Sequence, residues 1–213
     1  MRLVSVNVGL PKDVRWNGKT VTTSIWKEPV PGPVRVSRLN IDGDRQSDLS
    51  VHGGADKAVY VYPSEHYEYW RRELPGMELP WGSFGENFTT EGPSEEFRIG
   101  DRLSIGSAAF AITQPRLPCY KLAIRFGRPD IVKRFLRSNR TGFYLTVVCE
   151  GEVRAGDPIR LSAGPANSLS VGDIVRLYKA DIPDTETLKL ASQLAGLPTS
   201  WRDYFRKRLP ESD

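Results

Sequence analysis

Residues 109–126 read AFAITQPRLPCYKLAIRF and contain the change of pattern on which the expected fold depends. Ala109–Thr113 is an apolar and β-branched run, as expected for a buried strand. Pro118 cannot continue that strand, and Tyr120–Phe126 is compatible with a helix. We therefore expect a strand, a proline-bearing turn, and a helix that begins at Cys119.

Similar short runs of strand-forming residues fill the first 170 residues, where thirteen of the 16 prolines also lie. Many short strands with this punctuation indicate a sandwich or barrel and not a series of βαβ units. The expected strands are Met1–Asn7, Val34–Val36, Ala58–Tyr62, Ala109–Thr113 and Tyr144–Val148, and the expected helices are Ser64–Arg72, Tyr120–Phe126 and Ile131–Leu136.

The pattern becomes helical after Ser170, which can cap a first helix over residues 171–178. Asp184 opens a second helix that runs to Leu194, with Gly196 as the residue that ends it. A third helix starts at Pro198–Ser200 and runs to about Leu209. We expect residues 1–170 to form a mostly β domain, and residues 171–213 to form a three-helix appendage that packs on it.

Composition restricts the class of protein. The 213 residues carry a net charge of +4, and residues 171–213 have seven basic and seven acidic side chains, so the excess lies in residues 1–170. This surplus is too small to favour nucleic acid as a partner. No apolar run is long enough to span a membrane, and the N-terminus lacks a signal-peptide core. Two cysteines exclude a disulfide framework, so we expect free thiols and a cytoplasmic protein.

Cys119 is the first candidate for chemistry. At the start of a helix, with Arg116 and Lys121 as neighbouring cations, a cysteine is favoured as a thiolate, which is either a nucleophile or a ligand for a soft metal. The alternative is a structural cysteine without reactivity. Cys149 ends a strand-like run and is expected to be a small buried residue.

A second candidate is the loop Asp48–Lys57, which contains His52, Gly53, Gly54, Asp56 and Lys57. Its adjacent glycines allow the backbone to approach a ligand, and its amides and lysine can hold an anion. A tight structural turn explains the same residues equally well. His52 and His66 are the only histidines, and their spacing matches no zinc motif.

Phe84-Gly85-Glu86-Asn87 is a third candidate, either as a turn or as the polar wall of a pocket. The sequence lacks the motifs of α/β-hydrolases, P-loop NTPases, Rossmann dinucleotide-binding folds and zincins.

Together these segments resemble a known family. The matching blocks occur in the order Gly43–Val59, Tyr62–Trp70, Phe84–Asn87, Ile99–Asp101 and Gln114–Lys121. They are similar to those of the MOSC domain proteins (molybdenum cofactor sulfurase C-terminal domain), and within them to the YiiM-like subfamily. The resemblance covers residues 1–170, and YiiM-like proteins also carry a C-terminal three-helix appendage.

The resemblance implies a MOSC-type β-barrel domain that binds molybdenum cofactor (Mo-molybdopterin), with Cys119 as the metal ligand. It also implies a role for Asp56 near the metal, in orienting substrate or relaying a proton. The remaining expected cofactor-binding residues are Lys12, His52, Gly53, Gly54, Lys57, Asn87 and Arg116. Cations and backbone amides in this set suit the cofactor's phosphate.

The implied activity is the reduction of N-hydroxylated compounds such as hydroxylaminopurines, hydroxylamines and amidoximes. The implied electron donor is a separate flavoprotein or NAD(P)H-linked reductase, and the protein is expected as a monomer or homodimer. Two alternatives stay open. Cys119 can instead carry a persulfide in a sulfur carrier or cofactor-sulfuration domain, or the chain can be an anion-binding module without catalysis.

Overall fold

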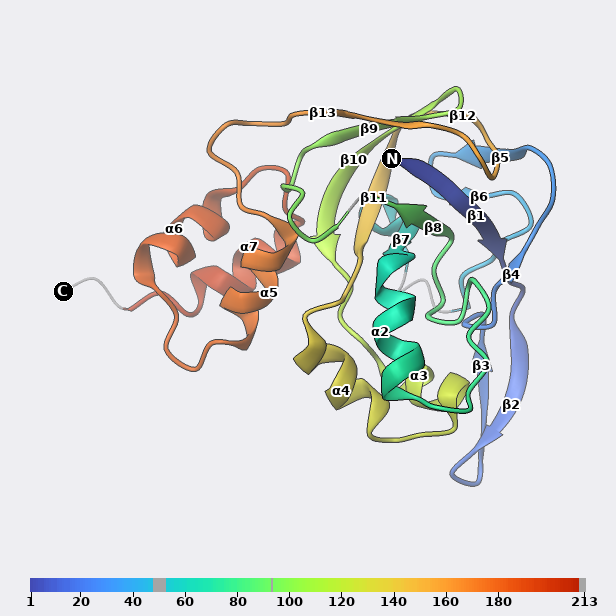
Figure 1. Ribbon diagram of the computed structural model, residues 1–213. Coiled ribbons are helices and arrows are strands. Elements are labelled where there is room, and N and C mark those ends of the chain that lie inside the picture. Colours follow the sequence, from blue (N-terminus) through green and yellow to red (C-terminus); the bar gives the residue numbers. More distant parts are fainter. Residues whose placement is uncertain (48–52, 93, 211–213) are drawn as a thin grey trace.

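The computed structural model describes residues 1–47, 53–92 and 94–210, and its main element is an eight-stranded sheet (Figure 1). The helices within residues 65–138 lie at one end of this sheet, and the helices within residues 171–206 lie at one side of it (Figure 1). In sheet order the strands are β13 (Ile159–Ser162), β9 (Arg102–Ile105), β10 (Ala108–Pro115), β11 (Phe143–Cys149), β7 (Val59–Pro63), β8 (Phe88–Glu91), β1 (Arg2–Val8) and β4 (Glu28–Pro29).

The expected mostly β domain with a MOSC-type β-barrel is only partly correct, because the sheet does not close into a barrel. Strand accounts for 31% and helix for 26% of the protein, so the fold is mixed α/β and its sheet is open. In the described part of the chain, β13 and β4 are the two edges of the sheet and do not pair with each other. The outer edge of β1 is divided, because Asn7 and Val8 pair with β4 while Leu3 exchanges backbone hydrogen bonds with residues 156–157. The sheet therefore curves back on itself without completing a ladder.

Two smaller sheets flank the large one. One contains β12 (Gly151–Val153), β5 (Val34–Ser37) and β6 (Asn40–Ile41). The other is the hairpin of β2 (Lys12–Trp16) and β3 (Lys19–Thr23), whose turn residues Asn17 and Gly18 both have positive φ. Two such residues give the turn a twist that matches antiparallel strands.

A βαβ crossover, which the sequence pattern did not predict, lies in the middle of the large sheet. β7 and β8 pair in parallel, and α2 (Glu65–Glu73) lies in the connection between them. The short helices η1 (Ala55–Lys57), α3 (Tyr120–Phe126) and α4 (Ile131–Ser138) complete this part. α2 and α4 share an aromatic core whose fully buried members include Tyr62, Tyr67, Trp70, Phe84 and Phe135.

The C-terminal three-helix region is present as α5 (Val171–Lys179), α6 (Thr185–Gln193) and α7 (Thr199–Arg206). Ser170 and Asp173 form a capping box at α5, and Asp184 accepts the Thr187 N–H at 2.8 Å at α6. The expected role of Gly196 is wrong, because its φ is negative. A Cβ at Gly196 would lie 3.2 Å from Ile99 Cγ2, so glycine here allows close packing on the β domain.

The three helices have no separate core. Val171, Ile174, Leu188 and Phe205 belong to the same buried cluster as the residues of β9 and β10. Trp201 extends this contact, because its Nε1 donates a hydrogen bond to Gln114 Oε1 at 2.6 Å. No helix in the described ranges is long and apolar enough to cross a membrane.

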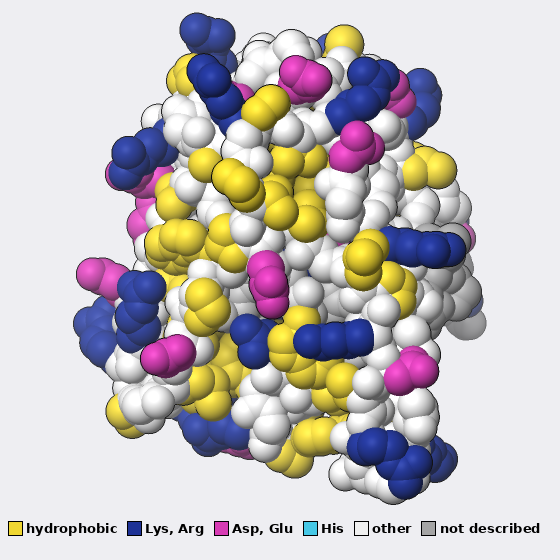
Figure 2. Space-filling view, turned by 90° about the vertical axis from the view of Figure 1, so that its right-hand side faces the viewer, with side chains coloured by type: hydrophobic (Ala, Val, Ile, Leu, Met, Phe, Trp, Pro, Cys, Tyr) yellow, Lys and Arg dark blue, Asp and Glu magenta, His cyan; other side chains and the backbone are white. Residues whose placement is uncertain are grey.

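The surface on the side of β2 and β5 is mixed in character. Lys and Arg side chains are scattered there among acidic and apolar ones and do not form a stripe (Figure 2). Four basic side chains, in contrast, line a single pocket.

We expect Trp201→Ala to lower the free energy of unfolding by about 3–5 kcal/mol, because it leaves a cavity and removes the partner of a buried amide. Urea unfolding measures this change. Ile182→Ala is the matched control, since Ile182 is 95% exposed and its loss should change stability by less than about 0.5 kcal/mol. A comparable small effect for Trp201→Ala would mean that the helices are not part of the common core.

Candidate functional site

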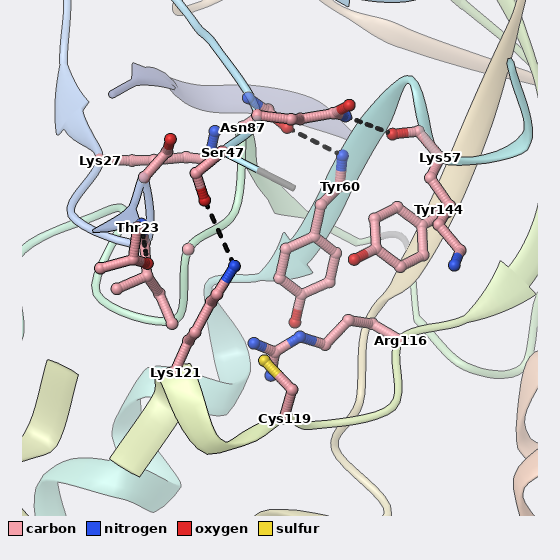
Figure 3. A pocket seen from close by; sticks show the side chains of 14 residues that line it. Thr23, Lys27, Ser47, Lys57, Tyr60, Asn87, Arg116, Cys119, Lys121 and Tyr144 are labelled. Atoms are coloured by element: carbon pink, nitrogen blue, oxygen red, sulfur yellow. Dashed lines mark hydrogen bonds between the residues drawn. The ribbon is translucent and has the colours of Figure 1, made fainter. Parts of the chain in front are cut away.

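One pocket gathers residues from six separate segments of the chain. It encloses about 600 Å³ of space not filled by protein atoms, including space that is open to solvent. Figure 3 shows the side chains that surround it. The lining residues are Thr23, Ser24, Ile25, Lys27, Gln46, Ser47, Lys57, Tyr60, Gly85, Asn87, Arg116, Cys119, Lys121 and Tyr144.

Cys119 lies on the wall of this pocket and is half-buried. It is the residue that precedes α3, with extended backbone at φ −117° and ψ 172°, and its carbonyl accepts the Leu122 N–H at 3.0 Å. The predicted strand, turn and helix around it are confirmed. β10 therefore ends at the pocket, and the thiol sits where the chain turns into the helix.

Four cations line the pocket, namely Lys27, Lys57, Arg116 and Lys121, and none of the described lining residues is acidic. Lys27 forms an ion pair with Asp44, whose side chain is 1% exposed. Burial lowers the pKa of Lys27, and the charge of Asp44 opposes this shift. Lys121 is buried and donates to Ser47 Oγ at 3.3 Å. This arrangement favours an anionic ligand.

Arg116 differs from the three lysines because its guanidinium contacts aromatic rings. Its guanidinium lies over the rings of Tyr60 and Phe135, at 5.3 and 5.1 Å. Burial acts to lower its pKa, but Tyr60, Tyr144 and Cys119 raise it, and the net shift is upward. The group is therefore a permanent positive charge.

Two buried polar atoms of the pocket wall have no hydrogen-bond partner among the described residues. They are Nη1 of Arg116 and Oγ of Ser24. An unpaired buried polar group costs about 1–3 kcal/mol, so such atoms mark positions that a ligand or water completes.

Lys57 reaches the pocket from η1. Gln46, another lining residue, donates from Nε2 to the Lys57 carbonyl at 3.0 Å. Burial lowers the pKa of Lys57, whereas the neighbouring charge of Asp56 raises it. The half-buried Lys57 side chain therefore adds a cation to the lining of the pocket.

The other residues of this loop are placed differently. Gly54 has φ +99° and precedes η1, which agrees with a tight turn, while Gly53 is half-buried. Asp56 is exposed, and its carbonyl accepts from Thr113 Oγ1 at 2.7 Å and from Gln114 Nε2 at 3.2 Å. Gly53, Gly54 and Asp56 do not line the pocket, so their roles stay predictions, and His52 lies outside the described residues.

Asn87 lines the pocket, but its amide is used within the fold. Nδ2 donates to Asp44 Oδ2 at 3.0 Å and to the Asn7 carbonyl at 3.4 Å, and Oδ1 accepts the Tyr60 N–H at 3.1 Å. Both amide protons are therefore already committed. We assign Asn87 the task of holding the strands that form the wall.

The turn before Asn87 is organised by a buried carboxylate. Glu86 accepts hydrogen bonds from the Gly82 and Phe84 N–H groups at 2.8 and 3.1 Å, and also from Tyr67 and Thr89. Burial raises the pKa of Glu86, although these donors act in the opposite direction. The turn presents Gly85, with φ +81°, to the pocket.

Lys12 is not brought to the pocket. It is exposed on β2, and its Nζ lies 4.3 Å from the centre of the Trp26 ring. Lys27, Tyr60 and Tyr144 line the pocket but were absent from the sequence prediction. No local motif marks them, because each comes from a segment that reaches the pocket only through strand pairing.

Cys149 is exposed, so its expected burial is wrong. The alternation of β11 would turn Cys149 inward, but the pairing with β10 shifts register between Ala109 and Phe110. Val148 is the extra residue of this irregularity, and the last two residues of β11 therefore face solvent.

The family of the chain follows from comparison with known proteins. The model of the MOSC domain matches residues 48–160, and that of the YiiM-like 3-alpha helix domain matches residues 169–210. The chain belongs to the MOSC domain family. Its matched region contains Lys57, Asn87, Arg116, Cys119 and Tyr144 of the pocket, so the family assignment and the site concern the same part of the molecule.

Individual relatives agree with this assignment. The uncharacterized protein YflK of Bacillus subtilis is 38% identical over 207 residues, which cover 97% of this chain and 93% of YflK. The crystal structure of YiiM from Geobacillus stearothermophilus has a TM-score of 0.82 and 35% identity, covering 98% of this chain and 99% of that one. A protein of Gibberella moniliformis named reductase is 33% identical over 213 residues, 97% of this chain but only 37% of that protein.

The protein should bind inorganic pyrophosphate in the pocket, and Lys57→Met should raise the Kd for pyrophosphate at least tenfold. The reason is that a charge-assisted hydrogen bond contributes about 1.5–3 kcal/mol, and 1.4 kcal/mol is tenfold in Kd. Titration calorimetry gives the two constants. Lys12→Met is the matched control and should bind as the wild type does; an equal loss in that variant would assign Lys12 to the site as well.

Proposed function

We propose that the protein is a molybdenum-cofactor-dependent reductase of N-hydroxylated compounds. The observation that carries the proposal is a half-buried thiol on the wall of a pocket lined by four cations and no described carboxylate. The proposal is supported by membership in the MOSC family and by a relative whose name is reductase.

The residues of the pocket fit such a cofactor. A thiolate at Cys119 is a soft ligand suited to molybdenum. The cofactor's phosphate needs cations and hydrogen-bond donors, which the lysines of the pocket and the unpartnered Ser24 hydroxyl supply. When bound, molybdenum cofactor supplies the two-electron redox chemistry that protein side chains cannot perform.

The proposed reaction is the two-electron reduction of an N-hydroxylated substrate, and its stoichiometry determines which groups the protein has to supply. An N-hydroxylated substrate takes up two electrons and two protons, its N–O bond breaks, and an amine (or the corresponding amidine) and water leave. The electrons come from a separate flavoprotein or NAD(P)H-linked reductase. The chain itself holds the cofactor, excludes bulk water from the deep end of the pocket and stabilises charge on the departing oxygen.

The principal alternative is a sulfur carrier in which Cys119 holds a persulfide. Both functions use the same thiol, so geometry alone does not separate them. They differ in composition: a reductase contains one molybdenum and one pterin per active chain, whereas a carrier works with a sulfur donor and no metal.

Cys119→Ser should abolish molybdenum retention and the reduction of a hydroxylaminopurine, because an alcohol is a far poorer ligand than a thiolate for a soft metal. Elemental analysis, a pterin assay and turnover with a reductase measure the loss. Cys149→Ser is the matched control, since its exposed thiol lies away from the pocket and should be silent. Full molybdenum content and turnover in Cys119→Ser would contradict the proposed function.

A further inference from the structure

We propose that His66 and Glu95 form a positioning pair, which holds one wall of the pocket in the geometry that binds an anion. Neither of these side chains lines the pocket itself. The wall concerned is the one that carries Tyr60, Arg116 and Tyr144. This role goes beyond the proposed function and does not rest on it, since it concerns the shape of the pocket and not the reaction performed there.

The imidazole of His66 and the carboxylate of Glu95 are directly hydrogen-bonded. Nε2 of His66 lies 3.0 and 2.9 Å from the two carboxylate oxygens, and each side chain is only 13% exposed. Burial acts to raise the pKa of Glu95, but the contact with His66 and the Gly142 N–H lower it, and the net shift is downward. Because an ionised carboxylate only accepts hydrogen bonds, Nε2 of His66 carries the proton.

The Glu95 carboxylate also holds the segment that leads into β11. Its Oε1 accepts the Gly142 N–H at 2.7 Å. Gly142 has φ +61°, and a Cβ at this residue would lie 2.2 Å from the Val61 carbonyl oxygen, so the backbone passes directly against β7. The carboxylate therefore fixes the backbone at a point where there is no room for a side chain.

The pocket wall is attached to the same segment. The Tyr60 hydroxyl donates to the Thr141 carbonyl at 2.8 Å, and the Tyr60 ring lies 5.3 Å from the Arg116 guanidinium. The Arg116 N–H donates to the Gly142 carbonyl at 3.4 Å. Tyr144 follows two residues after Gly142 and lines the pocket as well. The positions of three pocket residues therefore depend on the segment that Glu95 holds.

His66 is itself fixed by α2 and by the aromatic core. Its ring packs edge-on against Tyr62, with 5.2 Å between the ring centres, and the Tyr62 hydroxyl donates to the Arg140 carbonyl at 3.1 Å. Tyr60 and Tyr62 also interact with the charge of Glu95, but burial raises the pKa of both hydroxyls well above its ordinary value, so both stay neutral. The donor that compensates the buried carboxylate is therefore His66.

The backbone of Glu95 is held from the side of the C-terminal helices. Its carbonyl accepts the Gly172 N–H of α5 at 2.8 Å, and the Phe97 carbonyl accepts the Val171 N–H at 2.9 Å. The pair therefore connects α2, α5 and the start of β11 at one point behind the pocket wall.

Cys119 reports the position of Arg116 without any ligand. The guanidinium lies beside the Cys119 sulfur in the pocket (Figure 3), and the two groups interact electrostatically. If the wall moves, a thiolate at Cys119 loses a neighbouring cation and forms only at higher pH. The pH at which alkylation of Cys119 reaches half its maximal rate therefore measures the position of the wall.

The test uses chains that carry Cys149→Ser, so that Cys119 is the one remaining thiol. His66→Phe keeps an aromatic ring against Tyr62 but removes the donor to Glu95. It should raise the midpoint pH of alkylation by iodoacetamide by about one unit. It should also raise the Kd for inorganic pyrophosphate about tenfold, as for the loss of one charge-assisted hydrogen bond. His66→Gln, whose amide can donate from a similar position, should restore both values.

Glu73→Gln is the matched control. Glu73 belongs to the same helix as His66 and pairs with Arg134 at 2.6 Å, but neither residue of that pair lines the pocket, so both values should stay as in the wild type. Glu95→Gln removes the charge and keeps an acceptor for the Gly142 N–H. It guards against misfolding of His66→Phe and should shift both values in the same direction by a smaller amount.

A folded His66→Phe variant with the wild-type midpoint and Kd would overturn the positioning role, and so would equal shifts in Glu73→Gln. Circular dichroism shows whether each variant is folded. If the wild type binds no pyrophosphate, the alkylation midpoint alone decides. A wild-type protein that reduces no N-hydroxylated substrate would refute the proposed function and would leave both measurements unaffected.

Discussion

The buried amide of Gln114 joins three parts of the molecule that lie far apart in the sequence. Its Nε2 donates to the Asp56 carbonyl at 3.2 Å, and its Oε1 accepts from Trp201 at 2.6 Å. Gln114 is two residues before Arg116, so the same end of β10 fixes η1, α7 and the guanidinium in the pocket. Leaving one side of a buried amide unpaired costs about 1–3 kcal/mol. The position of the C-terminal helices and the shape of the pocket wall therefore depend on each other.

The pocket places positive charge where the fold supplies little negative charge. Lys27 is balanced by Asp44 behind the wall, but no carboxylate of the described residues lines the cavity that Lys57, Arg116 and Lys121 share. Burying a charged group whose donors are not all used, such as Arg116 with its unpartnered Nη1, is unfavourable, and the aromatic faces around Arg116 compensate only in part. A charged side chain with an unused donor on a pocket wall is expected of a preorganised binding site.

Local sequence pattern predicted several individual helices well, but it did not predict that the sheet stays open. The prolines before Cys119 and the polar caps at Ser170 and Asp184 act within a few residues, so the sequence predicted α3, α5 and α6 close to their observed limits. Whether the sheet closes into a barrel depends on which segments pair with the outer edge of β1. The exposure of Cys149 depends on a bulge relative to β10. Neither is a property of one segment, because both are decided by pairing between strands distant in the sequence.

The same difference between local pattern and tertiary packing determines how much of the candidate site the sequence could predict. Sequence proximity to the thiol identified Arg116 and Lys121 as cations near Cys119, but it did not show that they serve different parts of the pocket. Arg116 is held against Tyr60 and Phe135 beside the sulfur, whereas Lys121 extends to Ser47. Tyr60 and Phe135 belong to β7 and α4, so the direction of Arg116 is set by elements that no motif connects to Cys119. Tertiary packing therefore directs two cations that are close in the sequence to different parts of one pocket.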